Sequence, residues 1–413
     1  FSRSLSMPES PYVMLSVDAA LRLVLAHASR LTPVRLPLRA LGGRALAEDI
    51  VSAEAIPPFA AAAKDGYAVI AADGPGWRRL VGEQMAGYVG NERVTPGAVV
   101  RITTGAPLPP GADAVVMVEQ TQEQAGLVEI QTGVAPLADV RPPGIDLEVG
   151  QRVLSQGQRL GPAEIGLLAS LGLPDALVFP APRVAVLSTG DELRSPGETL
   201  APGQIRDSNR FSLMAAVQEA GGEPLDLGIA RDRQGDLEAC IRDGLLAADT
   251  LVTSGGVSMG QLDLLKPLLE MQGTVHFGRV NMKPGKPLTF ATIADKPVFA
   301  LPGFPVSSLV AFELFVRPAL LQMQGRADLA RLQVAVRLTH AVHHDPQRWE
   351  FVRAVVRREG DALIATTTGS QSSGRLLSMV GANALLQLAP AGNGTLPAGA
   401  LVSALLLNSN SPR

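Results

Sequence analysis

The sequence predicts a multidomain α/β plus β protein: a mostly parallel α/β domain, a small β-rich domain before it and a C-terminal β-barrel after it. The chain has 413 residues, 46% apolar and 18% charged, enough for about two to four domains of roughly 150 residues. Between residues 181 and 323, short apolar runs alternate with helical segments, which indicates a sheet covered on both faces. On either side, β-branched runs separated by Gly/Pro turns indicate smaller β-rich domains.

The first predicted helix covers 16–29, because apolar side chains recur there at helical spacing and Asp18 suits the first turn. Residues 36–142 follow as the small β-rich unit. A short helix is expected over 162–172, where Pro162 suits the first turn and Gly172 ends the helix. The strands expected in the β-rich unit are 99–103, 114–118 and 128–131.

The α/β region starts with an apolar run at 184–187 and ends with a long helix over 305–323. Its other predicted helices are 208–220, 234–247 and 261–271, and its other strands 225–229, 249–253, 274–280, 287–293 and 297–301. After residue 329 the helical spacing stops, which favours a small barrel. The barrel strands are expected at 332–338, 351–356, 363–366, 384–388 and 401–407.

Composition excludes several classes of protein. The net charge of −3 and the pI near 6.0 give no overall field that would attract nucleic acid. One cysteine, Cys240, excludes both a disulfide framework and a cysteine-based zinc site. No apolar run approaches the ~18 residues of a membrane span. We therefore expect a cytoplasmic protein, with Met7 the natural start and residues 1–6 an addition, a truncation or a trimmed transit peptide.

Three glycine-rich polar loops follow predicted strands: residues 188–192, 254–260 and 302–303. Ligands of open parallel sheets lie beyond the carboxyl ends of the strands, where glycines let backbone N–H groups approach an oxyanion. Lys283 and Lys286, two of only five lysines, lie in a further loop. Together these features predict a site for phosphate or another tetrahedral oxyanion; the alternative is ordinary strand-to-helix turns. The sequence has neither a Walker A nor a G-x-G-x-x-G motif.

Carboxylates gather at the same predicted edge: Asp191, Glu192, Asp207, Asp232 and Asp263. Beside a bound pyrophosphate they would repel it unless a divalent cation lay between, and Mg²⁺ takes one or two carboxylates plus phosphate oxygens. The alternative is that they cap helices and form turns, as Asp207 with Ser208 would.

Three histidines, His340, His343 and His344, raise a zinc alternative, but their spacing fits no single helical face. Cys240 lies in a helical pattern and is expected in the core. Neither Ser254 nor Ser258 has an evident His/Asp partner, which disfavours a serine-hydrolase triad.

Ten short motifs occur in order along nearly the whole chain. They are Pro57–Phe59, Lys64–Ala68, Thr103–Pro107, Gly111–Ala114, Arg141–Asp146, Ser188–Leu193, Ile205–Asn209, Ser254–Gly260, Met282–Pro287 and Ser373–Ser378. Together they resemble the motifs of the molybdenum insertases, which include bacterial molybdopterin molybdenumtransferase and the E domains of the plant insertase and of gephyrin. The sequences of Lys64–Tyr67 and Arg206–Asn209 are most similar to the plant and gephyrin branch.

The resemblance implies an elongated four-part protomer in a homodimer, with the partner's β-rich segment facing the active cleft. The parts would be a discontinuous linker and dimerisation domain (1–45 and 143–180), an inserted β-rich domain (46–142), the molybdopterin-binding α/β domain (181–328) and the barrel (329–413). It also implies a reaction: with Mg²⁺, molybdate is inserted into the dithiolene of adenylated molybdopterin, and AMP is released. A separate molybdopterin adenylyltransferase is a possible partner protein.

Individual site residues follow from the same resemblance. A molybdate dianion needs cations and hydroxyl or amide donors, and the matching positions are Ser258, Lys283, Lys286, Arg348 and Ser373. Expected to act in catalysis are Asp65, Thr104, Asp146, Asp191, Glu192, Asp232 and Asp263, the last four also as metal ligands. The expected substrate-binding residues are Thr189, Gly190, Asp207, Ser208, Ser254, Gly255, Gly256, Pro302 and Gly303.

Three positions depart from the family pattern. Ala60–Ala62 replaces an Asp or a Pro-Ala-Ser, Phe304 replaces an Asn, and Gly374 replaces a Ser. Two alternatives to an active insertase therefore stay open: a divergent, non-catalytic molybdopterin binder, and a gephyrin-like scaffold that binds a partner peptide.

Overall fold

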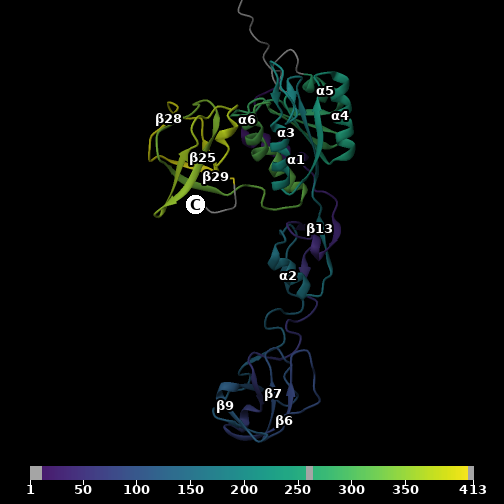
Figure 1. The fold of residues 1–413 in the computed structure, drawn as a ribbon, viewed down its shortest axis with the longest axis vertical. Coiled ribbons are helices and arrows are strands. Elements are labelled where there is room, and N and C mark those ends of the chain that lie inside the picture. Colours follow the sequence, from purple (N-terminus) through teal and green to yellow (C-terminus); the bar gives the residue numbers. More distant parts are fainter. Residues whose placement is uncertain (1–11, 257–263, 408–413) are drawn as a thin grey trace, which may run out of the picture. The chain divides into compact units, whose positions relative to one another are not determined.

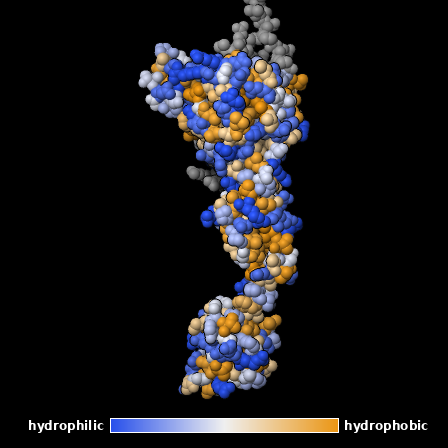
Figure 2. Space-filling view, turned by 90° about the vertical axis from the view of Figure 1, so that its right-hand side faces the viewer, coloured by the Kyte–Doolittle hydropathy of each residue, from blue (hydrophilic) through white to orange (hydrophobic). Residues whose placement is uncertain are grey.

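The computed structural model describes residues 12–256 and 264–407, shown in Figure 1. The chain forms two compact units. The larger contains Phe1–Ala47, Gly157–Gly161 and Asp175–Arg413, and the smaller contains Glu48–Gln156 and Pro162–Pro174. Polar and apolar residues are interspersed over the face of each unit seen in Figure 2.

The larger unit is built on a six-stranded sheet in the order β17-β14-β18-β22-β21-β19. The first four strands run parallel, and β21 pairs antiparallel with both β22 and β19. The expected mostly parallel sheet is confirmed, with an antiparallel edge that the sequence pattern did not reveal. The bounds are β14 (Arg183–Thr189), β17 (Glu223–Ala230), β18 (Thr250–Ser254), β19 (Thr274–Phe277), β21 (Thr289–Ile293) and β22 (Lys296–Leu301).

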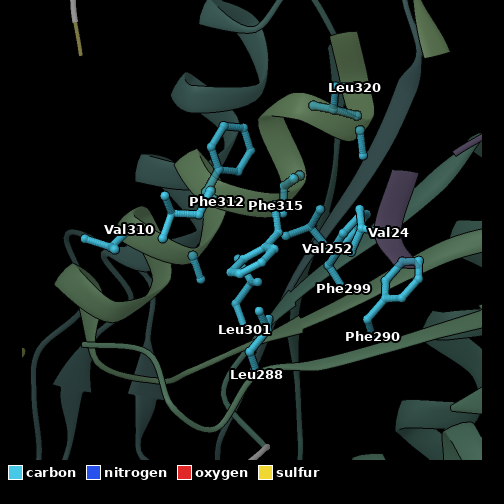
Figure 3. Close-up of a cluster of buried hydrophobic side chains, with 14 of the residues drawn as sticks. Val24, Val252, Leu288, Phe290, Phe299, Leu301, Val310, Phe312, Phe315 and Leu320 are labelled. Carbon is cyan, nitrogen blue, oxygen red and sulfur yellow. The ribbon is translucent and has the colours of Figure 1, made fainter. Parts of the chain in front are cut away.

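Helices cover both faces of this sheet, because successive strand residues point to opposite sides. Val184 and Val186 join the core under α1, α3 and the helix over 305–323, whereas Ala185 and Leu187 join the core under α4 and α5. Figure 3 shows the first core, in which Phe290, Phe299 and Phe315 lie close to Val252 and Leu301. The bounds are α1 (Val17–His27), α3 (Asn209–Glu219), α4 (Gln234–Ala247) and α5 (Leu265–Gln272).

The predicted helix over 305–323 is continuous but changes pitch: α6 (Pro305–Ala311) passes into a π-helical segment (Phe312–Val316) and then α7 (Arg317–Met323). Pro318, the second residue of α7, has no N–H to donate, so regular α-helical hydrogen bonding is interrupted where the π-helical segment passes into α7. The helix is long and apolar enough to cross a membrane, but 78% of the apolar window is buried. Packing in the core therefore accounts for its composition.

Residues 333–406 form the predicted β-barrel. Strands β25, β26, β23, β29 and β27 pair in that order, and β27 pairs again with β25. A core of small aliphatic side chains such as Val336, Val352 and Leu386 fills it. The bounds are β23 (Gln333–Leu338), β24 (Val342–His343), β25 (Trp349–Glu359), β26 (Ala362–Thr367), η5 (Leu376–Ser378), β27 (Ala384–Leu388), β28 (Thr395–Leu396) and β29 (Leu401–Leu406).

Short strands complete the larger unit. A three-stranded sheet has the order β1-β13-β2, and β20 joins the edge of the barrel sheet. These and the remaining elements are β1 (Val34–Pro37), η1 (Leu38–Ala40), β2 (Ala45–Leu46), β13 (Asp175–Phe179), β15 (Leu193–Arg194), β16 (Ile205–Arg206) and β20 (Met282–Lys283).

The smaller unit contains a second six-stranded sheet, in the order β8-β5-β7-β6-β10-β9, with apolar clusters on both faces. It confirms the β-rich character expected of this part of the chain. The bounds are β3 (Ile50–Val51), β4 (Ala61–Ala62), β5 (Gly66–Val69), η2 (Ala71–Asp73), β6 (Gly76–Gln84), β7 (Ala98–Ile102), β8 (Ala114–Met117), η3 (Val118–Gln120), β9 (Thr121–Gln124), β10 (Leu127–Ile130), β11 (Val140–Arg141), β12 (Arg152–Leu154) and α2 (Pro162–Ser170).

Gly273→Ala should destabilise the larger unit. A Cβ at this position would lie 2.1 Å from the carbonyl oxygen of Thr292, so α5 and β21 would have to separate. We expect a loss of about 1–3 kcal/mol in the free energy of unfolding, measured by urea denaturation. The matched control is Gly235→Ala in α4, where nothing lies within 4 Å of the added carbon and a gain of about 0.5–1 kcal/mol is expected.

Acid should weaken the packing of His276. Its ring lies 3.9 Å from that of His27, and burial, together with the charge of His27, lowers the pKa of His276 below its usual 6.5. The unfolded chain therefore takes up the proton more readily. Neutral His276 stabilises the fold above about pH 6.5, and this contribution is lost as the pH falls through the lowered pKa of His276.

We therefore expect wild-type protein to lose stability relative to His276→Phe between pH 7.5 and pH 5 in urea unfolding. Each unit by which the pKa is lowered corresponds to about 1.4 kcal/mol. The exposed control His343→Gln should show no such relative change. Equal pH dependence of wild-type and His276→Phe protein would contradict this account.

Candidate functional site

A pocket of about 100 Å³ lies at the carboxyl edge of the parallel strands, where β14, β18 and β22 end. This is where ligands bind in open α/β sheets. It gathers six of the nine substrate-binding residues expected from the sequence, and Glu192. Its lining is Thr189, Glu192, Leu193, Ile205, Arg206, Asp207, Ser208, Asn209, Ser254, Gly255, Gly303 and Pro305.

Glycine is required where two of the loops meet. Gly255 and Gly256 have φ of 95° and 67°, and a Cβ on Gly255 would lie 2.6 Å from the carbonyl oxygen of Thr189. Gly190, at φ 145°, leaves room for the carboxylate of Glu192, which would be 2.5 Å from a Cβ there. Residues with side chains would push the loops apart, so the glycines of the motif keep the pocket closed at its base.

Asn209, at the start of α3, connects the loops after β18 and β22. Its Nδ2 donates to Ser254 Oγ and to the Gly303 carbonyl, both at 2.7 Å. Its Oδ1 and the Thr189 hydroxyl are buried and have no hydrogen-bond partner among the described residues. Buried polar atoms are rarely left unpaired, and these two are enclosed behind the wall of the pocket. Asn209 belongs to the motif Ile205–Asn209, but the sequence alone predicted no role for it.

Asp207 lines the pocket but faces Arg210. Its carboxylate, in a residue that is 2% exposed, accepts from Ser188 Oγ at 2.9 Å, from Arg210 Nε at 2.8 Å and from Arg210 N at 3.2 Å. Asp226 binds the other side of the guanidinium at 2.6 Å. Burial opposes the charge of Arg210, but the two carboxylates raise its pKa above the ordinary value. Asp207 therefore caps α3, the alternative considered from the sequence, while Ser208 makes no side-chain cap bond.

Asp191, Glu192 and Asp232 lie close enough to influence one another. Burial raises the pKa of Asp232, and the charges of Asp191 and Glu192 raise it further, against a hydrogen bond from the Asp191 backbone. No group of three or more potential ligands is arranged around a metal position within the described chain. Asp263, the fourth predicted ligand, lies outside the described residues. A metal ion here would need ligands beyond these carboxylates, such as phosphate oxygens.

A second polar cluster lies where β20 pairs in parallel with the start of β25, Lys283 opposite Glu350. The Lys283 ammonium lies 3.2 Å from the Glu350 carboxylate, which is 3% exposed and also accepts from Asp345 N at 2.7 Å. Arg348 Nε donates to Asp345 Oδ2 at 2.7 Å. A backbone hydrogen bond from Gln347, with the charges of Arg348 and Lys283, lowers the pKa of Asp345.

Lys283 and Arg348, predicted from different domains, therefore pair with two neighbouring carboxylates, Glu350 and Asp345, which are joined by the hydrogen bond from Asp345 N to Glu350. Sequence reasoning missed Asp345 and Glu350, and one signal could have found them: they flank Arg348 at i−3 and i+2. Lys286 lies three residues after Lys283 and is half-buried. Its ammonium group makes no ion pair or hydrogen bond with any residue that the structure describes.

Arg353, also unassigned from the sequence, is fully buried in β25. Its Nε donates to Ser378 Oγ and its Nη2 to the Ser372 carbonyl, both at 3.2 Å, while its Nη1 has no partner in the described chain. Burial lowers the pKa of Arg353 to about 10. Arg353 thus holds the loop that carries Ser373, whose carbonyl accepts from Val306 N at 3.1 Å. This contact joins the loop of the barrel to the start of α6.

The other predicted residues are placed as follows. Thr104 donates to Asp65 through its N–H at 2.7 Å and its hydroxyl at 2.8 Å, which lowers the pKa of that exposed carboxylate. Asp146 pairs with Arg141. These residues belong to the smaller unit, and their part in any reaction stays a prediction. Ser258 lies outside the described residues, and Gly190, Gly256 and Pro302 are not in the pocket lining.

The histidines do not support the zinc alternative. His340 hydrogen-bonds to the threonines at 339 and 367, and His343 to Thr395, all through side chains. None of the three histidines belongs to a potential metal-binding group within residues 12–256 and 264–407. Cys240 is half-buried and packs at the margin of the core under α4, as the helical pattern predicted.

Comparison with known families agrees with this architecture. Residues 15–172 match the MoeA N-terminal region (domain I and II), residues 185–322 a probable molybdopterin binding domain, and residues 335–407 the MoeA C-terminal region (domain IV). The crystal structure of a molybdopterin biosynthesis MoeA protein from Pyrococcus horikosii has a TM-score of 0.84 at 34% identity. It aligns over 96% of this chain and 100% of its own.

Two relatives show the breadth of the family. Molybdopterin molybdenumtransferase 2 of Mycobacterium tuberculosis is 36% identical over 91% of this chain and 95% of its own length. Gephyrin of Dictyostelium discoideum is 40% identical over 96% of this chain, which spans only 63% of that gephyrin. The three matched regions, the shared fold and these relatives show that the chain belongs to the MoeA family of molybdenum cofactor biosynthesis proteins.

Proposed function

We propose that this protein is a molybdopterin molybdenumtransferase, which inserts molybdate into adenylated molybdopterin and releases AMP. The observation that carries the proposal is the pairing of β20 with β25, which brings the Lys283–Glu350 ion pair beside the Arg348–Asp345 ion pair. A relative of similar length bears the name of this activity. The pocket at the sheet edge supplies a second, separate set of polar groups for the organic substrate.

The charges of the polar cluster suit a dianion. In the cluster two cations, Lys283 and Arg348, pair with two carboxylates, Glu350 and Asp345, so these charges balance. Lys286, three residues after Lys283, and Arg353, three residues after Glu350, would supply the two further positive charges that offset the charge of molybdate. Charge-assisted hydrogen bonds from ammonium and guanidinium groups are the strong contacts for such an oxyanion.

Two cations of this set differ in availability. The Arg348 guanidinium is occupied by Asp345, whereas Arg353 Nη1 and the Lys286 ammonium have no partner among the described residues. We therefore assign the binding of the oxyanion to Lys286 and Arg353. Lys283 and Arg348 would contribute to the electrostatic potential around it. Ser373 would donate its hydroxyl from the loop that Arg353 holds.

The pocket, about 100 Å³ in volume, would bind one part of the adenylated molybdopterin, such as a phosphate group. Gly255 and Gly303 in its wall leave room for phosphate oxygens to approach the backbone. Asp191, Glu192 and Asp232 would hold Mg²⁺ together with that phosphate, since carboxylates beside a phosphate need a cation between them. The ion would neutralise charge on the phosphate oxygens.

A turnover assay tests the proposal directly. Purified protein is incubated with adenylated molybdopterin, molybdate and Mg²⁺, and AMP release and reconstitution of a molybdenum-dependent enzyme are measured. We expect both, with AMP release dependent on molybdate. Binding of adenylated molybdopterin without AMP release would instead identify a non-catalytic molybdopterin binder.

Loss of a charge from the polar cluster should weaken molybdate use. Lys283→Gln or Arg348→Gln removes one cation, and we expect the KM for molybdate in AMP release to rise about 10–100-fold, the magnitude of a charged hydrogen bond. Arg337→Gln, on another strand of the barrel, is the matched control and should leave the KM unchanged. An unchanged KM in both cluster variants would remove these residues from the site.

Arg353 offers a sharper test, because its charge is buried and only partly compensated. Removing the buried guanidinium ends its desolvation cost but leaves the Ser372 carbonyl without this donor. We expect Arg353→Met to lose about 1–3 kcal/mol in the free energy of unfolding in urea, and its affinity for molybdate to fall at least about tenfold. Normal molybdate binding by a folded Arg353→Met protein would contradict the assignment.

A further inference from the structure

Phe304 is a large apolar side chain on the rim of the polar pocket. Its neighbours Gly303 and Pro305 both line the pocket, and Phe304 itself is 63% exposed. Ile205, which lines the same pocket, is 55% exposed. Two exposed apolar side chains therefore border a pocket whose other groups are mainly hydroxyls, amides, carboxylates and backbone.

The backbone around Phe304 is fixed on three sides. The Gly303 carbonyl accepts from Asn209 Nδ2 at 2.7 Å, the Phe304 carbonyl accepts from Ser308 N at 3.0 Å, and Val306 N donates to the Ser373 carbonyl at 3.1 Å. The ring is therefore presented by the start of α6, between the pocket and the loop that carries Ser373.

The ring also lies against Gly374, the residue after Ser373. A Cβ on Gly374 would be 3.6 Å from Cδ1 and 3.7 Å from Cε1 of Phe304, which is van der Waals contact. Two positions at which this chain departs from the family pattern are thus neighbours in space. A glycine at 374 leaves the space beside this edge of the ring free.

Phe304 lowers stability in two ways that a polar residue would not. It is the N-cap residue of α6 but makes no side-chain cap bond, whereas asparagine is among the best N-cap residues. It also leaves most of an aromatic ring in water. A contact with a ligand would offset both costs, because aromatic rings stack favourably on flat heterocycles.

We propose that Phe304 is a stacking surface for a planar heterocycle of the substrate, adenine or pterin, and so helps to determine substrate specificity. The inference rests on the proposed function, which supplies a substrate with both rings. Both heterocycles carry an exocyclic amino group, which can donate to an acceptor of the pocket lining such as the Glu192 carboxylate. The apolar side chains and these acceptors together suit a flat, amino-substituted ring.

Binding measurements with two separate probes test this proposal. AMP and 6-hydroxymethylpterin are titrated into the full-length protein by isothermal calorimetry, without molybdate. We expect at least one of them to bind, and Phe304→Leu to weaken that probe about tenfold. Phe304→Tyr, which keeps the ring, should bind within about twofold of wild type. The probe affected identifies the ring that stacks.

A third variant separates stacking from folding. Phe304→Asn restores an N-cap residue, so its Tm should be equal to or above that of wild type while its affinity for the probe falls as in Phe304→Leu. Trp77→Leu, which removes an exposed aromatic ring from the smaller unit, is the control and should bind as wild type does.

The proposal is wrong if Phe304→Leu binds both probes as wild type does, or if wild type binds neither. These outcomes differ from failure of the proposed function, which is judged by AMP release with molybdate present. Active protein with unaltered probe binding in Phe304→Leu removes only the stacking role. If the protein is inactive but Phe304→Leu still lowers its affinity for the probe, the stacking role stands although the proposed function does not.

Discussion

The two-residue strand β20 determines how the charged groups of this protein meet. By pairing Met282 with Trp349 and Lys283 with Glu350, it connects the loop that leaves the α/β sheet with strand β25 of the barrel. Backbone hydrogen bonds fix this register, so the side chains of two domains meet without a long-range electrostatic force to draw them together. The contact between Val306 N and the Ser373 carbonyl fixes a second point of the same junction.

The two polar sites are built by different means. At the sheet edge, glycines with positive φ let loops approach to distances that no side chain would permit, and Asn209 connects them. At the junction with the barrel, two cations and two carboxylates are brought together in ion pairs. The first site suits a ligand recognised by hydrogen bonds and shape, and the second is the charged site to which the proposed function assigns the small anion.

Much of this arrangement could be predicted from local sequence. Apolar periodicity gave the helix over 305–323 and the five barrel strands, and glycine-rich runs after apolar runs gave the pocket edge, because these signals depend on neighbouring residues only. The strands at 274–280 and 287–293 were predicted, but not the antiparallel direction of β21, since strand direction depends on where the connecting loops pass. Asp345, Glu350 and Arg353 were missed because their importance comes from partners, such as Lys283 and Ser372, that lie close only in the folded chain. The resemblance to molybdenum insertases gave the residue roles; the spacing alone gave an oxyanion site.

The buried guanidinium of Arg353 has a consequence for the function proposed above. Positive charge attracts sulfate, tungstate and hydrogen phosphate as it would attract molybdate, since Coulomb attraction depends on charge and distance and ignores the central atom. Sulfate carries the same charge as molybdate, so electrostatics alone would leave it as a competitor. In a molybdenumtransferase, discrimination would therefore come from the chemical step itself, in which only a metal centre that accepts sulfur ligands can proceed.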